Sequence, residues 1–250
     1  MMQNSTSAKP FVSIRTIAFI FGWIFAVIAF AVPMDIFGMY YMFTVHMAQH
    51  LLLSLVAPPL ILLGVAPESL RRFLDRHTFL QRCFAVLTIP VLASLLFNGN
   101  IWIWHAPVLM RAMISSPFLH DVTNLLYLVT GLFFWCPLLE RTAGKKSPLS
   151  LAAKLAYLFF SDMPMMLLGA GLTFSPPLYT FTMSNPSMHM AVTATDQQLG
   201  GLLMWVVGGV FILVIVTSVL FLRWMLQQEK EQQAKDRKIV EEENASMEIA

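Results

Sequence analysis

The sequence predicts an all-α protein, a polytopic transmembrane helix bundle of about six spans with both termini in the cytoplasm. Of its 250 residues, 57% are hydrophobic and only 12% are charged, and the mean hydropathy is +0.68. Soluble domains carry about 25% charged residues. The chain also contains a series of apolar runs of roughly 20 residues, the length that a helix needs to cross a bilayer.

Six runs are long enough to span. They cover residues 14–32, 42–63, 83–101, 119–139, 151–172 and 198–222. The predicted organisation is a cytoplasmic segment over 1–13, a bundle over 14–222 and a charged cytoplasmic tail over 223–250 that extends the last helix. In the first run, Ala29-Phe30-Ala31 resembles a signal-peptidase site. A retained helix is the preferred interpretation because the run is long and rich in Phe and Trp.

The basic residues give the orientation. Fifteen of the sixteen Lys and Arg residues fall on one side of the predicted spans, and only Arg111 falls on the other. Positive charge near span ends marks the cytoplasmic side. On that side, a segment from Pro67 carries arginines on one face and Leu70, Phe73, Leu74 and Leu80 on the other, which is typical of an interfacial helix.

This topology places five of the six histidines at the outer side: His46, His50, His105, His120 and His189. His77 alone is cytoplasmic, where an interfacial role is expected. His46 and His50 are four residues apart, so one helix face presents both imidazoles and can offer them to one metal ion. His120 opens the fourth span at the same side. Histidines near helix ends also form ordinary interfacial hydrogen bonds, and that alternative stays open for each of them.

Methionines gather on the same side. Those in outer loops or outer helix ends are Met34, Met39, Met42, Met47, Met110, Met113, Met183, Met188 and Met190. Imidazole with thioether is a ligand set suited to copper, and thioether favours Cu(I). Packing remains the expectation for most of them, since Met is a common apolar filler. Met47, between the paired histidines, is a candidate ligand. Asp121 and Asp196 could ligate or orient an imidazole.

Asp162 is predicted near the middle of the fifth span. An ionisable group at that depth is costly and indicates a functional position, here a relay for a cation or proton with Met163 and Met166 beside it. The alternative is a polar bridge between helices. Elsewhere, Pro58-Pro59 predicts a bend in the second span. Gly200-Gly201 and Gly208-Gly209 predict close helix packing. Cys83 and Cys136 form no C-x-x-C pair, so we expect them to pack in helices.

Several stretches resemble a known family. They are His46-Met-Ala-Gln-His50-Leu-Leu-Leu, Ala57-Pro58-Pro59-Leu, Leu63-Gly64, Trp104-His105-Ala-Pro107, His120 with Leu132-Phe-Phe-Trp135-Cys-Pro137, and Asp196-Gln197-Gln198-Leu-Gly-Gly201 with Met204-Trp205. In this order, from about residue 40 to 210, the chain resembles the CtaG-type membrane proteins associated with assembly of copper-containing cytochrome c oxidase.

The resemblance implies a role in maturing the oxidase, with His46, His50, His105, His120, Asp196 and Gln197 as motif residues. Relatives often have a second histidine four positions after the one matching His120, and here that position is Asn124. The fourth helix then contributes one imidazole, and Asn124 is expected to orient a partner. The implied partners are oxidase subunits, copper carriers of the periplasmic or extracellular side and the lipid bilayer, with no nucleic acid.

The function that we expect from the sequence is a non-enzymatic assembly factor of the bacterial cytoplasmic (inner) membrane, with its histidine-rich face outside. It would bind copper through His46, His50 and His120, completed by His105, Asp196 or Met47. One alternative is a copper transporter that uses Asp162 and Met166. Another is a haem protein with His50 and His120 as axial ligands. The sequence contains no nucleophile–base pair and no nucleotide-binding loop, which disfavours an enzyme.

Overall fold

The computed structural model describes residues 13–31, 43–140, 149–179 and 192–249, and every regular element in these ranges is helical. In chain order they are α1 (Ile14–Phe30), α3 (Phe43–Leu51), the π-helix η1 (Leu52–Val56), α4 (Ala57–Gly64), α5 (Pro67–Asp75), α6 (Thr78–Leu87), α7 (Pro90–Trp104), α8 (Pro107–Ile114), α9 (Pro117–Leu138), α10 (Leu151–Phe174), α11 (Ala194–Leu202), the π-helix η2 (Leu203–Phe211) and α12 (Ile212–Ile249). The all-α prediction is confirmed for the described residues.

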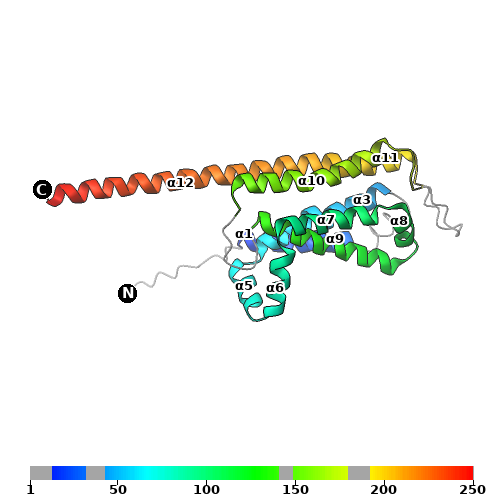
Figure 1. Ribbon diagram of the computed structural model, residues 1–250, viewed down its shortest axis with the longest axis horizontal. Helices are drawn as coiled ribbons and strands as arrows, with labels where there is room; N and C mark the ends of the chain where they lie inside the picture. The colour runs from blue at the N-terminus through cyan, green and yellow to red at the C-terminus, as the bar shows by residue number, and fades with distance from the viewer. Residues whose placement is uncertain (1–12, 32–42, 141–148, 180–191, 250) are drawn as a thin grey trace, which may run out of the picture.

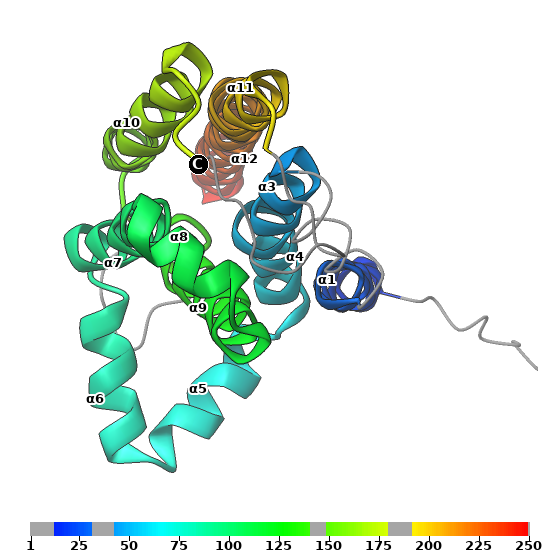
Figure 2. The same ribbon diagram turned by 90° about the vertical axis from the view of Figure 1, so that its right-hand side faces the viewer.

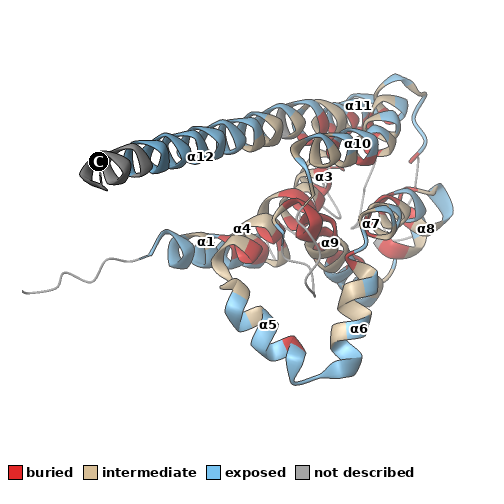
Figure 3. Cartoon of the chain, turned by 60° about the vertical axis from the view of Figure 1, so that its left-hand side comes forward, coloured by how far each residue is buried: buried red, intermediate tan, exposed pale blue. Residues whose placement is uncertain are grey.

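Four helical stretches are long and apolar enough to cross a membrane. They are Phe43–Gly64, Pro117–Leu138, Leu151–Phe174 and Ala194–Glu241. The bent pair of α6 and α7 makes a fifth if it counts as one span, whereas α1 is a shorter apolar helix. Large apolar side chains face outward from the bundle, among them Ile20 and Phe160, and the exposed outer helix faces are pale in Figure 3. Such outward apolar surface is typical of lipid contact.

The run predicted as a span over 83–101 is not one straight helix, because α6 and α7 meet at a 76° bend. The cause is Pro90, which begins α7 and disfavours the helical conformation of the residue before it. Ile89 is accordingly extended, with φ −63° and ψ 126°. Thr88, the last residue before Ile89, donates its hydroxyl to the carbonyl of Phe84 at 2.7 Å. The predicted interfacial segment is also divided, since Leu80 belongs to α6 and not to α5.

The second span changes its hydrogen-bond pattern below the histidine pair. Pro58 has no N–H, so it cannot donate to the carbonyl of Ser54 four residues earlier. That carbonyl instead accepts a hydrogen bond from Nε1 of Trp135 at 3.1 Å. Residues 52–56 form the π-turn η1 just before the two prolines. The expected irregularity at Pro58-Pro59 therefore takes the form of a π-turn whose free carbonyl binds α9.

The α3–η1–α4 span lies at the centre of the bundle (Figure 2). α1 packs on α4, α9 packs on η1 and α4, and α11 packs on α3. α10 runs lengthwise beside the α11–η2–α12 rod (Figure 1). The buried residues concentrate where α3, α7 and α9 face one another (Figure 3). The core thus surrounds the helix that bears His46 and His50.

Glycines bring the last helices close to their neighbours. A Cβ on Gly201 would lie 2.7 Å from the carbonyl oxygen of Gly169, and one on Gly208 would lie 2.8 Å from Cδ2 of Leu51. Real Cβ atoms do not approach backbone so closely, so the contact at Gly201 requires glycine, whereas the end of the Leu51 side chain can shift to admit a Cβ on Gly208. The close packing predicted from the paired glycines is confirmed.

The two ends of the bundle differ in charge. α5 and α6 lie at the end where α12 extends outward as a long exposed helix, and α8 lies at the opposite end (Figure 1). Arg71, Arg72 and Arg76 are exposed on or beside α5, whereas Arg111 lies on α8. Lys9, Arg141, Lys145 and Lys146 lie outside the described residues. The described basic residues are therefore divided between the ends as the sequence predicts.

Candidate metal centre

Three of the predicted histidines meet in the core. α3 presents His46 and His50 on one face, one helical turn apart, and the first turn of α9 presents His120. Their side chains are 2%, 5% and 0% exposed. Nε2 of His46 lies 2.8 Å from Nε2 of His50, and Nδ1 of His46 lies 3.4 Å from Nε2 of His120. His46 therefore stands between the other two rings.

Asn124 orients this cluster from one turn further along α9. Its Nδ2 lies 3.3 Å from Nδ1 of His120 and is placed to donate to it. A neutral imidazole has one donor and one acceptor nitrogen. His120 then donates from Nε2 to Nδ1 of His46, and His46 donates from Nε2 to Nε2 of His50. The chain ends at Nδ1 of His50, which is buried without a hydrogen-bond partner among the described residues.

The cluster contains the donors for a metal but not a finished three-ligand site. Two nitrogens each ~2.0 Å from one ion are about 3.3 Å apart at a tetrahedral angle. The 3.4 Å between Nδ1 of His46 and Nε2 of His120 fits that spacing, and the 2.8 Å to His50 is shorter. In the described ranges, no group of three or more His, Cys, Asp or Glu side chains is arranged to hold one ion. The reason is that His46 turns a different nitrogen to each neighbour.

His105 and Met47 form a second pair of donors. His105 follows the last residue of α7, and its Nδ1 is 2.7 Å from the carbonyl oxygen of Ile101, where it donates. Its Nε2 is 3.3 Å from Sδ of Met47. Burial lowers the pKa of His105 to about 4, against the opposing effect of the Ile101 hydrogen bond, so the ring is neutral near pH 7. Nε2 therefore has no proton and faces the sulfur with its lone pair.

Asp196 lies outside the histidine cluster and binds the first turn of α3 instead. Its Oδ2 accepts a hydrogen bond from the backbone N–H of Phe43 at 2.6 Å, and its Oδ1 accepts from the N–H and the hydroxyl of Thr44 at 3.1 and 2.6 Å. These N–H groups belong to the first turn of α3, which has no helical partner for them. Asp196 thus caps the histidine-bearing helix from α11.

Gln197 and Asp121 also lie apart from the three rings. The Gln197 amide donates to the carbonyl of Leu172 at 3.1 Å and accepts from the N–H of Leu178 at 2.7 Å, so it holds the segment that follows α10. Asp121 is exposed, on the side of α9 away from the buried His120. Neither side chain is placed to orient a ring of the cluster.

The predicted relay residues are divided. Asp162 and Met166 both face Gly209 of η2, where a Cβ would lie 3.4 Å from Oδ2 of Asp162 and 2.6 Å from Cγ of Met166. Oδ2 of Asp162 is buried without a partner among the described residues. Met163 is 43% exposed on the outer face of α10, so the expectation that it shares the face of Asp162 is wrong.

Sequence reasoning missed three buried residues beside the cluster. Met165 of α10, Met204 of η2 and Tyr127 of α9 line a small cavity together with Met47, His50 and His105. Met165 lies three residues after Asp162, a helical spacing that could have placed it on the inner face. The remaining outer candidates, His189, Met34, Met39, Met42, Met183, Met188 and Met190, lie outside the described residues.

Comparison with known proteins identifies a family. Residues 2–227 match the family described as cytochrome c oxidase caa3 assembly factor, Caa3_CtaG. The match spans the described helices from α1 into α12, including the histidine cluster. No significant match is found among curated proteins or among solved structures. Because the match covers most of its length, the chain belongs to the family of cytochrome c oxidase caa3 assembly factors.

Proposed function

We propose that the protein binds copper at an outer-face site formed by His46, His50 and His120 and supports its insertion into cytochrome c oxidase. The observation that supports this function best is the convergence of three buried imidazoles in a chain whose family is named for oxidase assembly. Imidazole is a good copper ligand, and a buried set excludes competing water. Copper is then a cargo, and the role is not catalytic.

The pair of His46 Nδ1 and His120 Nε2 is the entry point for the ion, since its spacing fits two ligands of one metal. Binding there removes the proton between them. His120 must then carry its proton on Nδ1 and needs an acceptor. Oδ1 of Asn124 is buried without a partner among the described residues, and a half-turn of the amide brings it into place. His50 joins the shell only after the ring of His46 turns, because His46 faces His50 with its other nitrogen, Nε2.

The membrane arrangement that goes with this function has six spans. α1 and the bent α6–α7 pair join the four long helices, and both termini lie in the cytoplasm of a bacterial inner membrane. The exposed arginines of α5 support this orientation, because positive charge favours the cytoplasmic side. The start of α3, with His46, then lies toward the outer face. Copper carriers of that side are the donors, and oxidase subunits are the acceptors.

The test is the copper content of purified protein in detergent. We expect the wild type to retain copper after gel filtration, and a His46→Ala, His50→Ala double variant to retain clearly less. His77→Ala is the control, because His77 is exposed between α5 and α6. Wild-type copper content in the double variant would contradict the site, provided that both proteins elute as folded monodisperse species.

Asp162 supports a second candidate, transport of copper through the bundle. Its buried Oδ2 has no partner in the described part of the chain, and Met166 offers a sulfur beside it. In proteoliposomes, a transporter accumulates copper and loses uptake in Asp162→Asn, whereas an assembly factor with an outer site shows no flux. Asp121→Asn, at an exposed carboxylate, is the control.

A haem held by His50 and His120 is disfavoured by packing. His46 lies within 2.8 Å of one ring nitrogen and 3.4 Å of the other, so it occupies the space between the two rings. A macrocycle there would displace His46 from the core. An absorbance spectrum with a Soret band would support haem and overturn this argument.

A further inference from the structure

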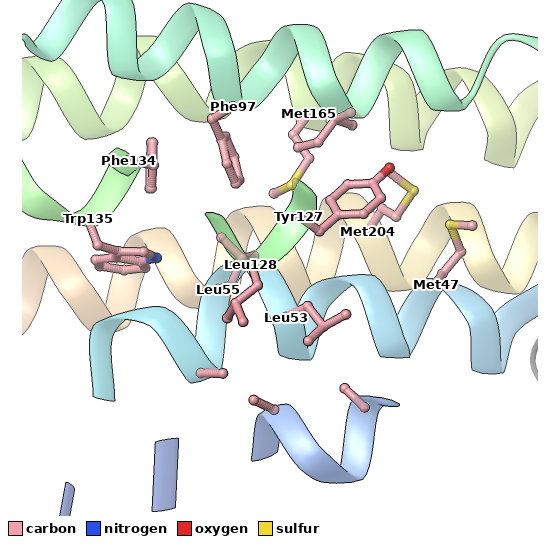
Figure 4. Close-up of a cluster of buried hydrophobic side chains, with 14 of the residues drawn as sticks. Met47, Leu53, Leu55, Phe97, Tyr127, Leu128, Phe134, Trp135, Met165 and Met204 are labelled. Atoms are coloured by element: carbon pink, nitrogen blue, oxygen red, sulfur yellow. The ribbon is translucent and has the colours of Figure 1, made fainter. Parts of the chain in front are cut away.

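A small cavity lies next to the histidine cluster, and three methionines are among the residues that line it. Met47 of α3, Met165 of α10 and Met204 of η2 reach it from three different helices, and His50, His105 and Tyr127 complete much of its wall. The three methionines are buried. Figure 4 shows Met165 and Met204 beside the Tyr127 ring, with Met47 further along α3. Its volume, about 10 Å³, corresponds to roughly one water-sized occupant.

The wall contains several electron-pair donors. The Nε2 lone pair of His105 faces Sδ of Met47 at 3.3 Å, because Nδ1 is fixed by the carbonyl of Ile101. In the tautomer that donates from Nδ1, Nε2 presents its lone pair to the sulfur, and a soft cation between the two atoms would join them. The hydroxyl of Tyr127 is also buried without a hydrogen-bond partner among the described residues.

The backbone around the cavity is shaped to bring the methionines in. A Cβ on Gly200 would lie 3.1 Å from Cγ of Met47, and one on Gly208 would lie 3.4 Å from Cε of Met165. Met204 projects from the π-helix η2, and π-turns are frequent at functional sites. A methionine that serves only as packing fills an irregular gap with its own side chain. These three methionines instead line a gap that their side chains do not fill.

We propose that this cavity is a second copper site, which holds one Cu(I) ion through the thioethers of Met47, Met165 and Met204 and Nε2 of His105. Thioether ligands select Cu(I) over harder divalent ions. The inference rests on the proposed function for the identity of the cargo. It adds a site of sulfur ligands next to the histidine site of the proposed function. His50 lies between the two sites, since its Nε2 faces His46 and its ring lines the cavity.

The probe is Ag(I), a soft monovalent ion that needs no reductant, titrated into the full-length protein in detergent. We expect the wild type to bind Ag(I), and a Met165→Leu, Met204→Leu double variant to bind it at least about 10-fold more weakly. Leucine conserves the volume, so the fold should persist. Met110→Leu with Met113→Leu is the matched control, because both are buried methionines of α8 that do not line the cavity.

A His46→Asn, His120→Asn double variant separates the two sites. It should lose copper at the nitrogen site and still bind Ag(I) as the wild type does. Unchanged Ag(I) affinity in the Met165→Leu, Met204→Leu variant would overturn the sulfur site and leave the histidine site untouched. Loss of copper in the histidine variant with no Ag(I) bound by the wild type would likewise overturn it.

X-ray absorption of the Cu(I)-loaded wild type tests the second site without any variant. Sulfur neighbours in the first shell are expected. A shell of nitrogen and oxygen alone would contradict the proposal, even if the double variant failed to fold.

Discussion

Nδ2 of Asn124 lies 3.3 Å from Nδ1 of His120, one turn back along α9. This contact sets the tautomer of His120 and, through it, the direction of every hydrogen bond to His46 and His50. A polar side chain that is not itself a ligand thus decides which nitrogens of the cluster are free to bind.

Replacing Asn124 with leucine should weaken copper binding without removing a ligand. The amide that orients His120 would be lost, and such orienting partners typically contribute 10- to 100-fold in metal affinity. The measurement is competition with a chelator of known affinity. Asn124→His, which introduces a second imidazole one turn from His120, should retain or strengthen binding. Equal affinity in Asn124→Leu and the wild type would show that the ring needs no such support.

The Asp196→Ala variant should lose stability but keep its copper. Asp196 satisfies the first N–H groups of α3, and loss of such a cap costs about 0.5–2 kcal/mol. We expect a lower thermal unfolding midpoint in detergent, measured by circular dichroism, with unchanged metal content. Asp121→Ala, at an exposed position of α9, should change neither quantity. Loss of copper at an unchanged midpoint would instead identify Asp196 as a ligand.

Alanine at Gly131 should disturb the site through the backbone. A Cβ there would lie 2.8 Å from the carbonyl oxygen of Ser54 and 2.9 Å from Cγ of Pro58, so α9 must move away from η1. Overpacking of this kind costs about 1–3 kcal/mol, and it displaces His120 relative to His46. Both the unfolding midpoint and the copper affinity should fall. Gly171→Ala is the control, since nothing lies within 4 Å of its Cβ position.

The Trp135→Phe variant tests the hydrogen bond that replaces the one lost at Pro58. Without the indole N–H, the Ser54 carbonyl is left buried and without that donor, at a cost of about 1–3 kcal/mol. A reduced unfolding midpoint is expected. Trp224→Phe, in the exposed part of α12, serves as the comparison and should have no effect. Equal midpoints for the two variants would mean that the π-turn is stable without α9.

The sequence was sufficient for the helical class and for the histidine-bearing helix, because hydropathy and helical spacing are local properties. The spacing of His46 and His50 places both on one face wherever the helix packs. Their approach to His120 was proposed from its place at the same outer side, but helical spacing does not determine it, since it depends on the rotation of α9 about its axis. The same rotation problem explains Met163, which faces outward, and Met165, which faces the cavity.

Two further features differ from the sequence predictions. One depends on a single residue within a hydropathy window, and the other on a contact between residues far apart in the chain. A window of 20 apolar residues treats 83–101 as one helix, although Pro90 alone decides the bend. A carboxylate at an outer helix end suggests a ligand, but Asp196 lies beside the uncapped N–H groups of a helix more than 150 positions earlier in the chain. No local pattern distinguishes these two roles.

The π-turn over Leu52–Val56 has a consequence for the direction in which the histidines of α3 point. A π-turn accommodates one residue more than the α-helical pattern, and each residue of an α-helix advances the side-chain direction by about 100°. The extra residue therefore shifts the angular phase of His46 and His50 relative to Pro58 and the rest of α4. Deleting one residue from this segment would keep the span and its hydrophobicity, yet would turn the histidines away from α9. The number of residues between His50 and Pro58 therefore sets the direction in which His46 and His50 point, while the packing of α4 stays the same.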